Sequence, residues 1–201
     1  MVISTSTTKD IDEILVRNIR EHGDRTAFSQ LVNKYQGTVF SFCYRYTGNR
    51  QDAEDIAQDV FIKVFNKIGS FRGEAKFSTW LYSIMVNTCS NYSRWTRNKR
   101  MNEMATFPPA EKEDSPRFAD FPDHSGDPEQ KLLNKELGQV IQGIIARLRY
   151  QQRSVVIMKD FQGKSYEEIA GIMKMNMGTV KSTLSRGRLA VAKKMKEYLE
   201  P

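Results

Sequence analysis

Residues 105–129 constrain the fold more than any other part of this sequence, because their composition opposes regular packing. The segment contains five prolines and seven acidic residues, against two lysine or arginine residues. Proline removes backbone donors and like charges repel one another, a combination typical of an extended linker. The 201-residue chain is therefore expected to form two modules, at about 9–100 and 129–199, joined by a flexible acidic linker at 101–128.

Apolar residues of the first module recur at helical spacing. They return every three or four positions in residues 28–42 and again in Asp52–Ile68, and a third helix is expected from Phe77 to about Arg97. The same spacing assigns Phe65 and Trp95 to the buried faces of their helices. No alternating strand pattern of useful length is present. The expected fold class is all-α, with two helical domains.

The charge balance favours a polyanionic partner. A net charge of +7 attracts phosphate backbones, although many basic proteins never meet nucleic acid. Cys43 and Cys89 are too few for a disulfide framework, which favours a reducing cytoplasm. No Cys/His spacing suits a metal and no apolar run is long enough to span a membrane. We therefore expect no metal, no cofactor and no membrane insertion.

The clearest local signals lie in the last quarter of the chain. Ser165 and Glu168 have the spacing of a capping box, in which each side chain bonds the backbone N–H of the other residue. After a short turn at Lys174–Met175, Asn176 is a good N-cap for a further helix. Gly187 in that helix permits close helix crossing. The pattern predicts two short-connected helices.

The second of these helices has a basic, hydroxyl-rich outer face. Lys181 and Arg186 can donate to guanine acceptors or to phosphates, and Ser182 and Ser185 can bond either group. Two helices joined by so short a turn match a helix-turn-helix whose second helix enters the major groove of DNA. An ordinary helical hairpin with solvated lysines is the alternative.

A second candidate surface lies on the helix at Asp52–Ile68. Asp52, Asp55 and Asp59 fall on one stripe with Gln58 beside them, and we call these four residues the acidic stripe. DNA binding does not explain it, because carboxylates repel phosphate. The helix dipole stabilises the acids nearest the N-terminus. The residues alone leave two readings open, a docking face for a basic protein helix and a solvated face.

The third candidate surface interleaves aromatic with polar and basic residues over 71–100. Unpaired bases stack on aromatic rings while cations hold the backbone, so this composition suits single-stranded nucleic acid. Several of the aromatic residues are expected in the core. The basic residues Arg94, Arg97, Lys99 and Arg100 are better candidates for phosphate contacts.

The three surfaces together resemble a known family. Residues 52–65 (DAEDIAQDVFIKVF) and 70–87 (SFRGEAKFSTWLYSIMVN) are similar to domain 2 of the extracytoplasmic-function (ECF) sigma factors of bacterial RNA polymerase. Residues 165–173 (SYEEIAGIM) and 178–188 (GTVKSTLSRGR) are similar to sigma domain 4. The resemblance covers about residues 9–199, and the order of the motifs is highly specific.

The resemblance implies roles for the first module. The helix matching 55–68 would dock on the clamp helices of the polymerase β′ subunit, which favours the docking reading of the acidic stripe. The following loop and helix would engage the non-template strand of the minus-ten element. The implied polymerase-binding residues are Asp52, Asp55, Gln58, Asp59, Val60, Lys63 and Ile68. The implied minus-ten residues are Phe71, Arg72, Lys76, Phe77, Trp80, Asn87, Asn91 and Arg94.

For the second module, the resemblance implies that the helix-turn-helix recognises the minus-thirty-five element as double-stranded DNA. The implied DNA-binding residues are Tyr166, Thr179, Lys181, Ser182, Thr183, Ser185, Arg186 and Arg188. The linker would thread toward the RNA exit path. The implied partners are core RNA polymerase (β′ clamp helices and β flap), promoter DNA in duplex and single-stranded form, and a separate anti-sigma factor. The implied function is a non-catalytic, cytoplasmic sigma factor that directs core polymerase to promoters in a stress or envelope response.

Two departures from the family pattern stand out. Leu-Pro commonly precedes the domain 4 helices, whereas Leu148 is followed here by Arg149. Ser185 is small where relatives often carry a bulkier side chain, which implies a different promoter sequence. Two rival functions would require other sequence features. A stand-alone helix-turn-helix regulator would not need the acidic stripe, and a nucleic-acid enzyme would need a metal-binding cluster or a glycine-rich phosphate loop.

Overall fold

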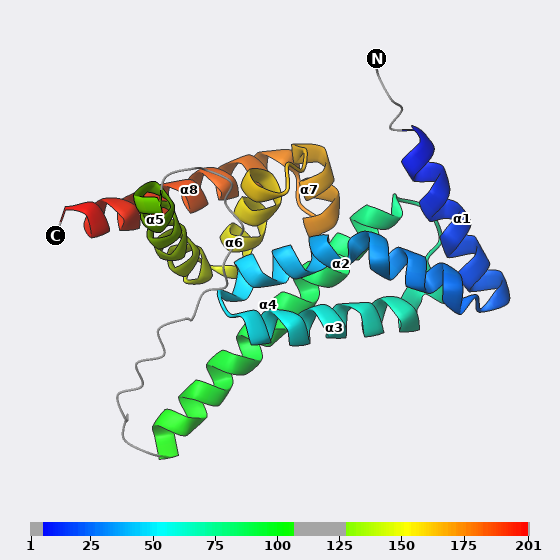
Figure 1. The fold of residues 1–201 in the computed structure, drawn as a ribbon, viewed down its shortest axis with the longest axis horizontal. Helices are drawn as coiled ribbons and strands as arrows, with labels where there is room; N and C mark the ends of the chain where they lie inside the picture. Colours follow the sequence, from blue (N-terminus) through cyan, green and yellow to red (C-terminus); the bar gives the residue numbers. More distant parts are fainter. Residues whose placement is uncertain (1–5, 107–127, 201) are drawn as a thin grey trace.

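A computed structural model describes residues 6–106 and 128–200, with side chains described for 11–97 and 136–200 (Figure 1). Within these residues every ordered element is helical, which confirms the all-α prediction. The first half contains α1 (Ser6–His22), α2 (Arg25–Thr47), α3 (Arg50–Lys67), the 3-10 turn η1 (Ile68–Ser70) and α4 (Phe77–Thr106). The second half contains α5 (Pro128–Ala146), α6 (Tyr150–Val156), the π-helical turn η2 (Ile157–Phe161), α7 (Tyr166–Met173) and α8 (Met177–Leu199).

The boundaries of α4 and α5 refine the predicted linker. The helix α4 continues to Thr106, so the first residues of the 101–128 segment are helical. Pro128 opens α5, a position at which proline costs no backbone hydrogen bond. The rest of the predicted linker, residues 107–127, lies outside the described residues.

Short polar residues fix the helix ends in the first half. Asp24 accepts hydrogen bonds from two backbone N–H groups of the first turn of α2, and Asn49 caps α3 by accepting from the Asp52 N–H at 3.1 Å. Gly48 ends α2 with a φ of 75°, a left-handed conformation that glycine adopts without a Cβ clash. Each such N-cap contributes about 1 kcal/mol to helix stability.

The first half packs α2 along α3, with α1 against α2 and α4 against α3 (Figure 1). Val39, Phe42 and Leu81 are fully buried in this core. Two residues assigned to buried faces by their spacing are corrected by the structure. Phe65 is 51% exposed, with its ring 5.1 Å from that of Phe28 of α2, and Trp95 is 59% exposed, with its ring 6.1 Å from that of Tyr92.

The second half holds α8 against α6 and α7. Gly187 of α8 lies so close to α6 that a Cβ on it would stand 2.8 Å from Val156 Cγ2, as its predicted role in close crossing requires. Leu148 is buried and α6 begins at Tyr150, with Arg149 at the N-cap position. The helix therefore begins normally, although Arg149 stands where the family pattern commonly has proline.

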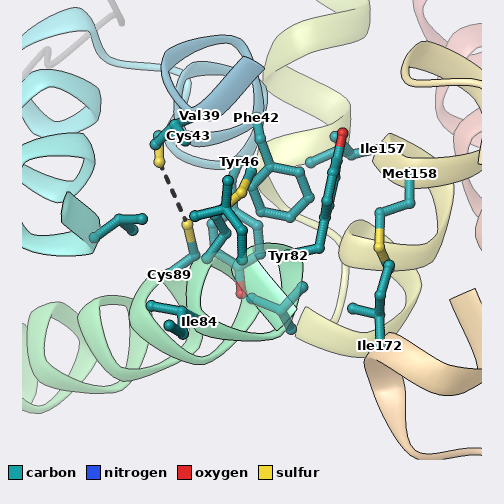
Figure 2. Packing of buried hydrophobic residues seen from close by; sticks show 14 of the residues in the cluster. Val39, Phe42, Cys43, Tyr46, Tyr82, Ile84, Cys89, Ile157, Met158 and Ile172 are labelled. Carbon is teal, nitrogen blue, oxygen red and sulfur yellow. Dashed lines mark hydrogen bonds between the residues drawn. The ribbon is translucent and has the colours of Figure 1, made fainter. Parts of the chain in front are cut away.

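The two halves share one core. The helix α7 packs against α4, and α5 and η2 pack against α2. Figure 2 shows Phe42 and Tyr82 of the first half in the same buried cluster as Ile157, Met158 and Ile172 of the second. We call this contact region the interdomain junction. No helix in the described residues has both the length and the apolar character needed to cross a membrane.

Candidate nucleic-acid interface

The outer face of α8 is accessible and basic. Lys181, Ser182, Ser185 and Arg186 are exposed, as predicted for the reading helix. Arg186 folds back along the helix, donating from Nε to the Ser182 carbonyl at 3.2 Å and from Nη2 to Ser182 Oγ at 3.3 Å. These bonds hold a guanidinium with five donors over the first half of the helix, where base edges would lie.

Local capping positions the start of that helix. Ser165 Oγ accepts from the Glu168 N–H at 3.1 Å while Glu168 Oε2 accepts from the Ser165 N–H at 2.8 Å, which confirms the capping box of α7. Lys174 ends α7 in a left-handed conformation, and Asn176 Oδ1 then accepts from the Thr179 N–H at 2.7 Å. The predicted helix-turn-helix is therefore present.

Two further residues that are predicted to contact DNA, Arg188 and Tyr166, interact with neighbouring side chains of the protein. Arg188 is exposed and forms a bidentate ion pair with Asp160 of η2, with an Nη2–Oδ1 distance of 2.5 Å. The hydrogen bonds and charge of Asp160 raise the pKa of Arg188 above its usual value. Tyr166 is half-buried, with the ammonium groups of Lys159 and Lys181 at 4.6 Å and 5.6 Å from its ring centroid.

Thr183 is a correction to the predicted DNA-binding set. Its side chain is buried on the inner face of α8, beside Leu184, so packing and not base contact explains it. The other predicted hydroxyl near the start of the helix, Thr179, is half-buried.

The acidic stripe lies on the outer face of α3. Asp55, Gln58 and Asp59 are exposed and Asp52 is half-buried. Sequence reasoning missed two apolar members of the same surface. Ile62 and Phe65 are each 51% exposed. At about 100° of rotation per residue, Ile62 falls on the face that carries Asp55 and Asp59, and Phe65 falls beside Gln58 at the edge of that face. The surface is thus acidic with an apolar end, the composition of a protein-docking face.

Three other predicted polymerase contacts occupy different positions. Val60 and Ile68 are buried in the core, which corrects their assignment to the docking face. Lys63 is half-buried and donates from Nζ to Thr88 Oγ1 of α4 at 3.3 Å. It therefore ties α3 to α4.

The predicted minus-ten residues divide into a polar surface and an aromatic cluster. Arg72, Lys76, Asn87, Asn91 and Arg94 are exposed, and Arg94 donates to Asn91 Oδ1 at 2.7 Å.

Phe71 and Phe77, by contrast, are buried, with ring centroids 6.0 Å apart, and both rings contact the half-buried Trp80. This corrects the direct-contact prediction for the two phenylalanines. They pack the loop that presents Arg72 and Lys76.

Comparisons with known proteins agree with this arrangement of surfaces. A family model for Sigma-70 region 2 matches residues 31–100, and one for Sigma-70 region 4 matches residues 138–191. The ECF RNA polymerase sigma-E factor of Haemophilus influenzae is 36% identical over 188 residues, covering 94% of this chain and 97% of the relative. This chain belongs to the ECF sigma factor family. It is a transcription initiation factor that directs RNA polymerase to promoters.

Other relatives support the same membership. The RNA polymerase sigma-H factor of Pseudomonas aeruginosa is 33% identical over 198 residues, covering 96% of this chain and 97% of the relative. A solved structure of the sigma factor RpoE with the anti-sigma factor NepR from Bartonella quintana matches with a TM-score of 0.61 at 25% identity, over 84% of this chain and 96% of that one. The structure of CnrH with the cytosolic domain of CnrY shares the fold, with a TM-score of 0.64 at 20% identity, over 94% of this chain and 99% of that one.

Proposed function

We propose that this sigma factor binds the β′ clamp helices of core RNA polymerase through α3 and reads a promoter at two places. The docking residues are Asp52, Asp55, Gln58 and Asp59, with Ile62 and Phe65 completing the surface. Arg72, Lys76, Asn87, Asn91 and Arg94 meet the single-stranded minus-ten element. Lys181, Ser182, Ser185 and Arg186 enter the major groove of the minus-thirty-five element.

The observation that carries this proposal is the separation of charge between α3 and α8. An exposed acidic face on α3 repels DNA and suits a basic protein helix, whereas the exposed face of α8 is basic and suits phosphate and guanine. The two faces belong to different halves of the chain. A polymerase-docking face and a DNA-reading face can therefore be occupied together.

The partners of the relatives suggest two further assignments. Since the RpoE relative was solved with an anti-sigma factor, a separate anti-sigma protein is proposed as a partner here. The second half would contact the β flap. The chain would act in the cytoplasm as a subunit without catalysis of its own, because polymerase supplies the chemistry of RNA synthesis.

The test is transcription from sheared genomic DNA of the source bacterium by its core polymerase, with and without this chain, followed by sequencing of the RNA 5′ ends. Transcripts that begin at a shared pair of upstream sequence elements, and only when the chain is present, are expected. An unchanged set of transcripts would overturn the proposed function.

Reversal of charge on the docking face gives a sharper test. Asp55→Lys with Asp59→Lys is expected to lower affinity for core polymerase at least tenfold, measured by fluorescence anisotropy, because two lysines would face a basic partner helix. Glu21→Lys with Glu136→Lys makes the same change in net charge at exposed sites on α1 and α5, away from α3, and should leave affinity within twofold. Equal affinity of both variants would show that the stripe is only solvated.

A further inference from the structure

Leu189 is an apolar side chain on the side of α8 that is otherwise polar and basic. It is 71% exposed, more than any other large hydrophobic residue in the described part of the chain. The buried side of the same helix is formed by Val180, Leu184 and Gly187. At about 100° of rotation per residue, Leu189 lies on the opposite side of the helix from Val180. Its side chain therefore projects directly away from the core.

The position of Leu189 continues the row of residues proposed to read the minus-thirty-five element. It follows Ser182 by seven residues, Ser185 by four and Arg186 by three. In a helix that lies in the major groove, residues at positions i, i+3, i+4 and i+7 face the base edges together. Ser182, Ser185, Arg186 and Leu189 have this spacing and are all exposed, and we call these four residues the reading face.

Short side chains on the same side of α8 allow Leu189 to reach the bases. Gly178, Ser182 and Ser185 carry at most one heavy atom beyond Cβ. A surface of small residues lets a helix backbone approach its partner closely. Leucine projects farther from the helix than serine does. When the backbone lies close to the base edges, the methyl groups of Leu189 therefore contact the base that stands opposite.

The charges around Leu189 favour DNA as the partner that covers it. Lys181 and Arg186 precede it and Lys193 follows it, and all three side chains are exposed. A basic surrounding attracts the phosphates that flank a groove. Leu189 is also continuous with the surface already proposed to enter the major groove. A duplex bound there would cover this leucine without any further rearrangement of the chain.

The chemistry of leucine selects among the four bases. Its side chain has no hydrogen-bond donor or acceptor, so it cannot recognise the polar groups of guanine, cytosine or adenine. The apolar group that a base presents in the major groove is the C5 methyl of thymine. Packing leucine against that methyl removes apolar surface from water, whereas another base would lose hydrogen bonds to water against it.

We infer that Leu189 determines specificity for thymine at one position of the minus-thirty-five element by packing against the thymine C5 methyl. Along the helix axis Leu189 lies about 4.5 Å beyond Arg186. One base-pair step is about 3.4 Å, so the thymine is expected within about two base pairs of the base that Arg186 contacts. This assignment rests on the proposed function, because it concerns the same helix in the same groove.

Selection from a randomised promoter tests the role of Leu189 in the full chain bound to core polymerase. The probe is a promoter found by sequencing RNA 5′ ends, with its upstream element randomised, and the bound duplexes are sequenced. The unmodified chain is expected to select thymine at one position, and Leu189→Ala should lose that preference and keep the others. Leu199→Ala is the matched control, because it truncates a leucine that is 65% exposed at the end of α8, and it should select like the unmodified chain.

Deoxyuridine in place of the selected thymine removes the C5 methyl group and leaves every hydrogen-bonding group of the base. In fluorescence anisotropy, this replacement is expected to weaken binding to the unmodified chain with core polymerase about three- to fivefold, the effect of one buried methyl. With Leu189→Ala, the two duplexes should bind equally. Urea denaturation should show that this variant is as stable as the unmodified chain, because the leucine is exposed and alanine favours a helix.

The outcomes separate the role of Leu189 from the proposed function. A selection that Leu189→Ala leaves unchanged would overturn the inference and assign the leucine to a protein partner. An equal loss of affinity for every upstream sequence would also overturn it, because that result identifies a contact with the DNA backbone. Either result leaves the proposed function standing. If the unmodified chain selects no upstream sequence at all, the reading role proposed for α8 is itself overturned.

Discussion

At Gly187 the helices α6 and α8 approach so closely that a side chain at this position would overlap its neighbours. Alanine normally favours a helix over glycine by about 1 kcal/mol. At this position a methyl group would meet Val156 Cγ2 at 2.8 Å and Gln152 Cβ at 3.5 Å. Steric overlap of that size outweighs the gain in helix propensity.

Gly187→Ala is therefore expected to lower the free energy of unfolding by about 1–3 kcal/mol, measured by urea denaturation, since overpacking forces neighbours from their rotamers. Gly143→Ala on α5 is the matched control, because nothing lies within 4 Å of its Cβ position. That variant should raise stability by several tenths of a kcal/mol. A loss of stability in both, or in neither, would contradict the steric explanation.

The thiols of Cys43 and Cys89 are predicted to be inert in the folded protein. They lie 3.9 Å apart, fully buried between α2 and α4 (Figure 2). Burial, followed by the hydrogen bond with Cys43, raises the pKa of the Cys89 thiol well above its usual value, which keeps the reactive thiolate scarce. Alkylation by iodoacetamide at pH 8 should be at least 100-fold slower than in urea, whereas a Gln36→Cys thiol on the surface should react at nearly the unfolded rate.

The raised pKa of the Cys89 thiol predicts how the free energy of unfolding changes with pH. The folded chain keeps Cys89 protonated above the pH at which an unfolded thiol ionises. The contribution of this thiol to the free energy of unfolding is therefore complete below about pH 8.5 and is lost as the pH rises beyond it. Rapid alkylation of the native protein would contradict the burial described here.

At the scale of elements, the sequence was informative where the signal is local. The capping box at Ser165 and Glu168, the cap at Asn176 and the glycine at position 187 follow from the chemistry of one turn or one crossing. Periodicity was less reliable, because a partly exposed apolar residue has the same spacing as one in a core. Phe65 was misplaced for that reason.

Other misplacements came from transferring a whole motif to one surface. Val60, Ile68 and Thr183 lie inside motifs with surface roles, yet their own side chains face the core. The interdomain contacts could not be found at all. Gln142 and Tyr44 are 98 positions apart, and no local pattern marks either as the other's partner.

The reading helix gives a prediction of its own. Arg186→Ala is expected to reduce use of a promoter by about 1–3 kcal/mol if the guanidinium donates to a guanine of the upstream element. Lys193→Ala, exposed at the far end of α8, is the control and should have little effect. In vitro transcription from promoters with altered upstream elements is the measurement. An equal loss on every altered promoter would identify a phosphate contact and not a base contact.

At the scale of the whole molecule, the continuous core predicts that the halves unfold together. Thermal unfolding followed by calorimetry should show one transition, because Phe42 and Tyr82 are buried by residues of the second half. In Gln142→Ala with Gln162→Ala, which removes hydrogen bonds to backbone carbonyls of α2, the coupling is weakened, and the transition is expected to broaden or divide. Gln36→Ala with Gln151→Ala removes two exposed amides and should retain a single transition. Two separate transitions in the unmodified chain would contradict a shared core.

The π-helical turn η2 has a consequence for how related chains diverge. Its Gln162 N–H bonds the Ile157 carbonyl five residues back, so the turn contains one residue more than an α-helical turn would. That extra residue rotates Phe161 and Gln162 toward α2 and α4 while Ile157 and Met158 stay in the shared core. Deleting a single residue here would restore a regular helix and aim those two side chains elsewhere. A descendant could thus keep its helix-turn-helix and lose these contacts between the halves through the deletion of one codon, without exchanging any side chain of α7 or α8.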